Sequence, residues 1–64
     1  MYTDIKRAES KVKQLNPSAR VTYFPMEAMW TAWVGNEMLG GWDVREHGFH
    51  SKIDALNALI EFLK

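Results

Sequence analysis

The chain has 64 residues, no cysteine, and eight basic against eight acidic side chains. A chain of this length makes one small domain, whose single core contributes only about 3–5 kcal/mol of net stability. The missing thiols exclude disulfides and thiolate chemistry, and the balanced charge lacks the strongly basic signature of most nucleic-acid-binding proteins. We therefore expect residues 1–64 to fold as a single domain that relies on packing or on self-association.

The charge is distributed unevenly along the chain. Residues 1–20 hold five basic and two acidic residues, a net charge of +3, whereas residues 21–50 hold one basic and four acidic residues, a net charge of −3. No apolar run approaches the roughly 20 residues that span a bilayer. The N-terminus also lacks the charged-then-apolar layout of a secretion signal. These features predict a cytoplasmic protein.

The first predicted helix runs from about Asp4 to Leu15. Thr3 or Asp4 can accept hydrogen bonds from the free N–H groups of its first turn. Pro17 ends the helix, because proline disfavours helical geometry in the residue before it. The helical spacing of the apolar side chains gives one stripe, formed by Ile5, Ala8, Val12 and Leu15. This helix is expected to pack that stripe against the core and to expose its opposite side.

A second helix is predicted after Ser51 and ends at Leu63. Ser51 is a good N-cap, and Asp54 lies where a negative charge favours a helix N-terminus. The apolar face is wide and consists of Ile53, Leu56, Leu59, Ile60 and Leu63, extended by Ala55 and Phe62. Leu59 lies in the middle of this face and is predicted to be buried in the core.

Three strands are predicted between the helices. Their ranges are Arg20–Phe24, Met29–Val34 and Met38–Val44. Gly35-Asn36 predicts a hairpin turn, because both residue types tolerate positive φ. Gly40-Gly41 marks a weak point or a bulge in the third strand, and Arg45–His50 is predicted to be a loop. The expected fold is a single α+β domain of α-β-β-β-α order, with both helices on one face of a three-stranded antiparallel sheet.

This order and the entry to the second helix resemble the double-stranded-RNA-binding domain. That family has a glycine loop, then Ser-Lys-Lys, then alanines on the helix. The matching positions here are Gly48, Ser51, Lys52 and Ala55. Ile53 and Leu56 stand where the family has further lysines, and Pro25-Met26-Glu27-Ala28 stands in place of its Gly-Pro-x-His loop. The resemblance implies the fold, and it implies that lysines at the helix entry would contact phosphates.

Aromatic and methionine side chains are concentrated in the middle of the chain. Strand alternation places Trp30, Ala32 and Val34 on one face and Trp33 on the other. If the helices cover the first face, Trp30 and Trp42 are buried and Trp33 is exposed. The open face is predicted to present Trp33, Leu39 and one of Tyr23 or Phe24 to a partner. The alternative is that Trp33 only covers Gly40-Gly41 locally.

Catalysis and metal binding find little support in the sequence. His47 and His50, with Glu46 and Asp43 nearby, offer a loosely spaced set of zinc-type ligands on a loop, and we interpret them as loop histidines. Ser51 beside His50 is adjacency in sequence, which is not the spatial relay that nucleophilic catalysis needs. We expect no enzyme activity, no metal ion, no cofactor and no small-molecule substrate.

Two functions follow as hypotheses. The first is a non-catalytic module that binds a protein partner, or itself, through the open sheet face and strand edges, as small bacterial or phage proteins do when they occlude a larger machine. Its candidate residues are Trp33, Leu39, Tyr23 and Phe24. The second is binding to nucleic acid, in particular double-stranded RNA. Its candidate residues are Lys6, Arg7, Lys11, Lys13, Ser51 and Lys52. The basic stripe on the first helix can equally be a solvated face.

Overall fold

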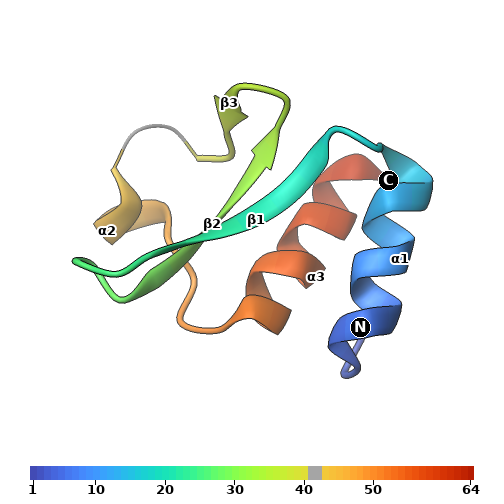
Figure 1. Cartoon of the computed structure of the whole chain (residues 1–64), viewed down its shortest axis with the longest axis horizontal. Coiled ribbons are helices and arrows are strands. Elements are labelled where there is room, and N and C mark those ends of the chain that lie inside the picture. The colour runs from blue at the N-terminus through green and yellow to red at the C-terminus, as the bar shows by residue number, and fades with distance from the viewer. Residues whose placement is uncertain (41–42) are drawn as a thin grey trace.

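The computed structural model describes residues 1–40 and 43–64. In chain order, the elements are α1 (Ile5–Leu15), β1 (Ala19–Phe24), β2 (Met29–Val34), β3 (Glu37–Met38), α2 (Val44–His47) and α3 (Lys52–Leu63). The strands form one antiparallel sheet in the order β1-β2-β3. Helices α1 and α3 pack beside each other on one face of this sheet (Figure 1). The predicted α+β domain is confirmed, with one additional short helix before α3.

Side-chain caps fix the start of both long helices. The Asp4 carboxylate accepts hydrogen bonds from the N–H groups of Lys6 and Arg7, at 2.9 and 3.3 Å, and α1 begins directly after it. Ser51 does the same for α3, because its Oγ accepts from the N–H of Asp54 at 3.2 Å. Both caps satisfy N–H groups that have no partner within the helix. The predicted helix starts are therefore confirmed.

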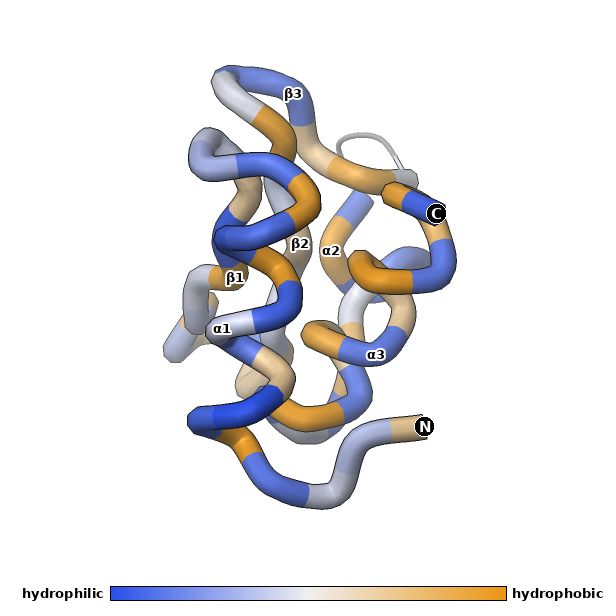
Figure 2. Tube along the Cα trace, turned by 90° about the vertical axis from the view of Figure 1, so that its right-hand side faces the viewer, coloured by the Kyte–Doolittle hydropathy of each residue, from blue (hydrophilic) through white to orange (hydrophobic). Residues whose placement is uncertain are grey.

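The core is formed where α1, α3 and the sheet meet. Its buried residues are Ala8, Val12, Ala19, Ala32, Leu56, Leu59 and Ile60. The alanines lie on both the helices and the strands, so that main chains approach each other closely while Leu56 and Leu59 fill the space between them. Leu59 is fully buried, as predicted. Figure 2 shows α1 and α3 together on the near side of the sheet, with α1 over β1.

The register of β1 against β2 decides which side chains share a face. Ala19 pairs with Val34, Val21 with Ala32, and Tyr23 with Trp30. Because Ala19 and Ala32 belong to the core, this set faces the helices. The remaining side chains of the two strands face away from α1 and α3. The prediction that Ala32 and Val34 lie on the helix-covered face is confirmed.

The prediction for the third strand is wrong beyond Met38. The strand ends there because Gly40 adopts a φ of +87°, a conformation that suits a turn. Asp43 then caps α2 by accepting from the N–H of Arg45 at 3.0 Å, so Val44 begins a helix. This short helix also replaces the first half of the predicted loop Arg45–His50. The predictions for Gly41 and Trp42 lie outside the described residues.

The segment between α2 and α3 covers part of the second sheet face. Phe49 and Trp30 exchange two main-chain hydrogen bonds of 2.8 Å. Phe49 therefore lies along the same side of β2 as β3, next to an earlier part of the strand. At Gly48, an added Cβ would lie only 2.7 Å from Sδ of Met29, a side chain on the face opposite α1 and α3. Thr31, on the same face, is only 1% exposed. The face predicted to be open is therefore partly covered.

Candidate functional site

Trp33 lies on the face away from α1 and α3, but its neighbours cover it. Its indole N–H donates to Oγ1 of Thr22 at 2.8 Å. The guanidinium carbon of Arg20 lies 5.2 Å from its ring centroid, and Arg20 also donates to the carbonyl oxygen of Gly35 at 2.6 Å. Trp33 is half-buried, so it is less exposed than predicted, and Trp30, predicted to be buried, is also half-buried.

The four predicted partner-binding residues do not form one surface. Phe24 shares the sheet face of Trp33. Tyr23 lies on the opposite face, where its ring centroid is 5.2 Å from that of Trp30, and it is 48% exposed. Leu39 packs against the core from the turn after β3. The predicted set is therefore divided among three places on the molecule.

An apolar concavity lies between the end of β2, β3 and the last turn of α3. We call it the β3–α3 hollow. Its lining residues are Val34, Glu37, Met38, Leu39, Gly40 and Phe62. Phe62 is 60% exposed at its rim, whereas Val34, Met38 and Leu39 are half-buried. The hollow thus brings Leu39, one of the predicted residues, together with an exposed aromatic ring.

The sequence pattern placed Phe62 on the core-facing stripe of the second helix. Phe62 lies at the margin of that stripe, and the two-residue strand β3 is too short to cover it. At the C-terminal end of α3, Nζ of Lys64 donates to the carboxylate of Glu61 at 2.9 Å. This hydrogen bond lowers the pKa of the Glu61 carboxyl and raises the pKa of Lys64.

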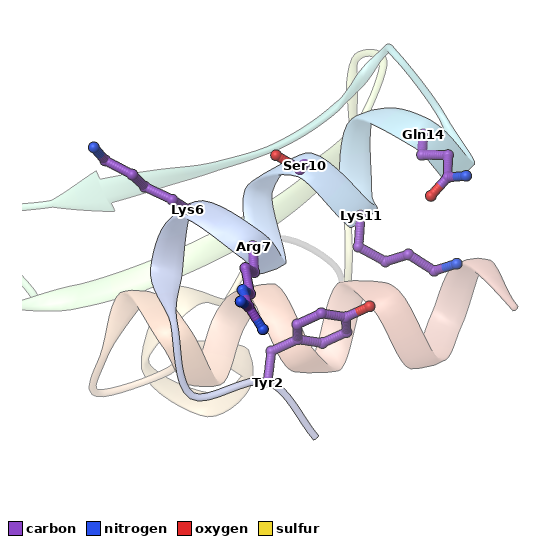
Figure 3. A pocket seen from close by; sticks show the side chains of 6 residues that line it. All are labelled: Tyr2, Lys6, Arg7, Ser10, Lys11 and Gln14. Atoms are coloured by element: carbon purple, nitrogen blue, oxygen red, sulfur yellow. The ribbon is translucent and has the colours of Figure 1, made fainter.

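The outer side of α1 carries a basic surface, which we call the α1 surface. It is a shallow concavity lined by Tyr2, Lys6, Arg7, Ser10, Lys11 and Gln14. In Figure 3 the Tyr2 ring lies between the side chains of Arg7 and Lys11, and Lys6 points away from them. Among the described residues, none of these three cations forms an ion pair with a carboxylate. They are therefore available to an anionic ligand.

The other three predicted nucleic-acid-binding residues have structural partners. Lys13 donates from Nζ to the carbonyl oxygens of Ala19 and Pro17, at 2.9 and 3.3 Å. Lys52 lies 3.1 Å from Glu9 and 5.6 Å from the ring centroid of Trp30. The Ser51 hydroxyl caps α3. Only Lys6, Arg7 and Lys11 of the six share the α1 surface.

His47 and His50, the two histidines of the predicted zinc-type set, lie at the end of α2 and just before α3. Within residues 1–40 and 43–64, no three histidine or carboxylate side chains form a group that could hold a metal ion. His47 is exposed and lies against Gly40, where an added Cβ would meet Cβ of His47 at 2.6 Å. His50 is exposed beside the cap of α3. In the described part of the chain, no helix has the length and apolar character of a membrane span.

No protein-family model matches the chain, and neither a curated protein nor a solved structure shows significant similarity to it. Its function must therefore be inferred from the two surfaces and from the sheet itself.

Proposed function

We propose that this chain is a non-catalytic interaction module that binds another protein at the β3–α3 hollow. The main support for this proposal is the ring of Phe62, which is 60% exposed and lines the hollow together with the half-buried side chains of Met38 and Leu39. An exposed aromatic side chain next to an apolar concavity is typical of the anchor of a protein interface. Binding there would cover apolar surface that otherwise stays in water.

The hollow is a better candidate than the face that carries Trp33. The indole N–H of Trp33 already has a partner in Thr22, and its ring lies beneath Arg20. An anchor side chain gains most when it leaves water on binding, and Trp33 has already lost part of its contact with water. Phe62 is 60% exposed, so its burial by a partner would contribute more.

A pull-down from lysate, with and without nuclease, tests this proposal when it is combined with a matched pair of variants. Phe62→Ser removes the exposed ring of the hollow. Met26→Ser is the control, because Met26 is 95% exposed in the distant turn between β1 and β2. Neither change touches the core, so far-UV circular dichroism and thermal unfolding should remain close to those of the parent.

The proposal predicts that the parent and Met26→Ser retain the same protein after nuclease treatment and that Phe62→Ser loses it. Equal retention by all three proteins would exclude the hollow. If the retained species is a second copy of the chain, sedimentation should show an oligomer that Phe62→Ser dissociates, and the hollow would then be a self-association site.

Nucleic-acid binding is a second candidate, favoured by the cations of the α1 surface, which pair with no carboxylate in the part of the chain that the structure describes. The α-β-β-β-α order is compatible with a double-stranded-RNA-binding fold. However, Leu56, at a position where that family has a lysine, is 2% exposed and belongs to the core. Lys52 is held by Glu9. Any phosphate contacts would therefore come mainly from Lys6, Arg7 and Lys11, and we expect weak binding.

A further inference from the structure

The outer edge of β1 has main-chain groups that the sheet does not use. Trp30 exchanges hydrogen bonds with Phe49, and the carbonyl oxygen of Ala32 accepts from the N–H of Leu39, so these groups of β2 point away from β1. In an antiparallel pair, the residues opposite them point outward as well. Those residues are Tyr23 and Val21.

At this edge, only the first residue, Ala19, has partners among the described residues for both of its outward main-chain groups. The N–H of Ala19 donates to the carbonyl oxygen of Asn16 at 3.0 Å, and its own carbonyl oxygen accepts from Nζ of Lys13 at 2.9 Å. Within the described residues, β1 is the outermost strand of the sheet, and the outward groups of Val21 and Tyr23 have no partner. Unpaired groups of this kind are a template for an added strand.

Cations lie on both sides of the sheet at the first half of this edge, and the acidic Glu27 lies in the turn at its other end. Lys13 lies on the helix side, over Ala19. Arg20 is exposed on the other side, where its guanidinium lies inward from the edge, over Trp33 of β2 and at the carbonyl oxygen of Gly35. Glu9, the nearest acid on α1, is paired with Lys52. A strand added at this edge would therefore be favoured if it carried acidic side chains.

A second copy of the chain does not suit this position. Helix α1 lies over β1 (Figure 2). Two β1 strands paired edge to edge would bring two α1 helices together across the junction. Each helix would carry Lys6 and Lys13 toward the other, and like charges at close range oppose association. A single extended peptide without a helix of its own avoids this conflict.

We propose that the outer edge of β1 binds an extended, acidic segment of a partner protein, which adds to the sheet as a fourth strand. Its main chain pairs with Val21 and Tyr23. One of its faces places apolar side chains beside these two residues. The other places carboxylates on the sheet face of Arg20, whose guanidinium turns from the Gly35 carbonyl toward the edge to meet them. This site is separate from the β3–α3 hollow, and it stands whether or not the hollow binds a protein.

The test uses a capped peptide of alternating glutamate and valine, about seven residues long to match a typical strand. Titrated into the ¹⁵N-labelled protein, it should shift the amide signals of Val21 and Tyr23 and slow their exchange with solvent. The amides of Thr22 and Phe24 already bond to β2, so their exchange should change less. An absence of shifts along β1, or shifts confined to the hollow around Phe62, would overturn the proposal.

Two control peptides separate backbone pairing from charge. The same peptide with N-methylated valines keeps its side chains but loses the donors that face β1, so it should bind at least about tenfold more weakly. A peptide with lysine in place of glutamate should also bind more weakly. Equal binding by the N-methylated peptide would exclude strand addition, and equal binding by the lysine peptide would exclude the charge preference.

A pair of protein variants checks the role of Arg20. Arg20→Gln should weaken binding of the glutamate peptide, whereas Lys64→Gln, which removes a cation at the far end of α3, should not. The amide spectra of both variants show whether the fold is intact. If Arg20→Gln is folded and binds the peptide as the parent does, Arg20 does not select acidic peptides. If the variant is unfolded, the N-methylated and lysine peptides still test strand addition and the charge preference with the parent protein.

Discussion

Asn57 binds both main-chain groups of Tyr2, a residue 55 positions earlier in the chain. Its Oδ1 accepts from the N–H of Tyr2, and its Nδ2 donates to the carbonyl oxygen of Tyr2, each at 2.8 Å. These two hydrogen bonds hold the segment before α1 against the middle of α3. They thereby place the Tyr2 ring on the α1 surface.

Replacing Asn57 with alanine should destabilise the domain by about 1–3 kcal/mol, because two partly buried hydrogen bonds are lost together. Gln14→Ala is the control, since Gln14 is an exposed amide on α1 and its loss should stay within about 0.5 kcal/mol. Urea unfolding measures both. Equal midpoints for Asn57→Ala and the parent would show that the N-terminal segment is not fastened in solution.

Leu59→Ala tests the core. Leu59 is fully buried among residues from both long helices and the sheet, so its truncation should cost about 2–5 kcal/mol. A domain of this size has about that much stability in total, and the variant should be largely unfolded at 25 °C. Circular dichroism against temperature measures this outcome. A melting temperature within a few degrees of the parent would mean that Leu59 is not a core residue.

The contact between Trp33 and Thr22 should be measurable by a double-mutant cycle. Trp33→Phe and Thr22→Val each remove one partner of the 2.8 Å hydrogen bond; Thr22→Val keeps the side-chain shape, and Trp33→Phe keeps an aromatic ring. We expect a coupling free energy of about 0.5–1.5 kcal/mol. Strictly additive effects would indicate that the bond is not formed, and Trp33 would again be a candidate for an exposed anchor.

Local signals were sufficient to predict most of the fold. Asp4 and Ser51 cap the helices that follow them, and alternation in Met29–Val34 gives that strand with its correct bounds. The C-terminal end of the third strand was mispredicted because a single backbone angle determines where the strand stops. Gly40 turns the chain at positive φ, and the Asp43 cap then favours a helix where alternation suggested a strand.

The candidate sites were less predictable, because they depend on contacts between elements. Alternation separates the two faces of a strand, but it left Tyr23 and Phe24 as alternatives until the register with Met29–Val34 was known. The cover over Trp33 comes from Arg20, its direct partner across the strands. The exposure of Phe62 depends on how far the sheet reaches along α3. No local pattern contains this information.

Nucleic-acid binding, if it occurs, should be weak and should depend only modestly on salt. Lys6, Arg7 and Lys11 allow about three phosphate contacts, which predicts a slope of about −2 to −3 for log K against log salt. Fluorescence anisotropy with a duplex RNA of about 20 base pairs measures this slope. Lys11→Gln should reduce the slope by about one. Submicromolar binding at about 150 mM salt, the physiological ionic strength, would favour the nucleic-acid function over protein binding.

The most direct test of protein binding at the β3–α3 hollow is photocrosslinking in the cell with benzoylphenylalanine in place of Phe62. The substituted ring keeps an aromatic side chain at the rim of the hollow, where Phe62 is exposed. The same probe at Met26 is the control. We expect one crosslinked protein product that depends on position 62 and resists nuclease. Identical products from both positions, no product, or a nuclease-sensitive product would contradict it.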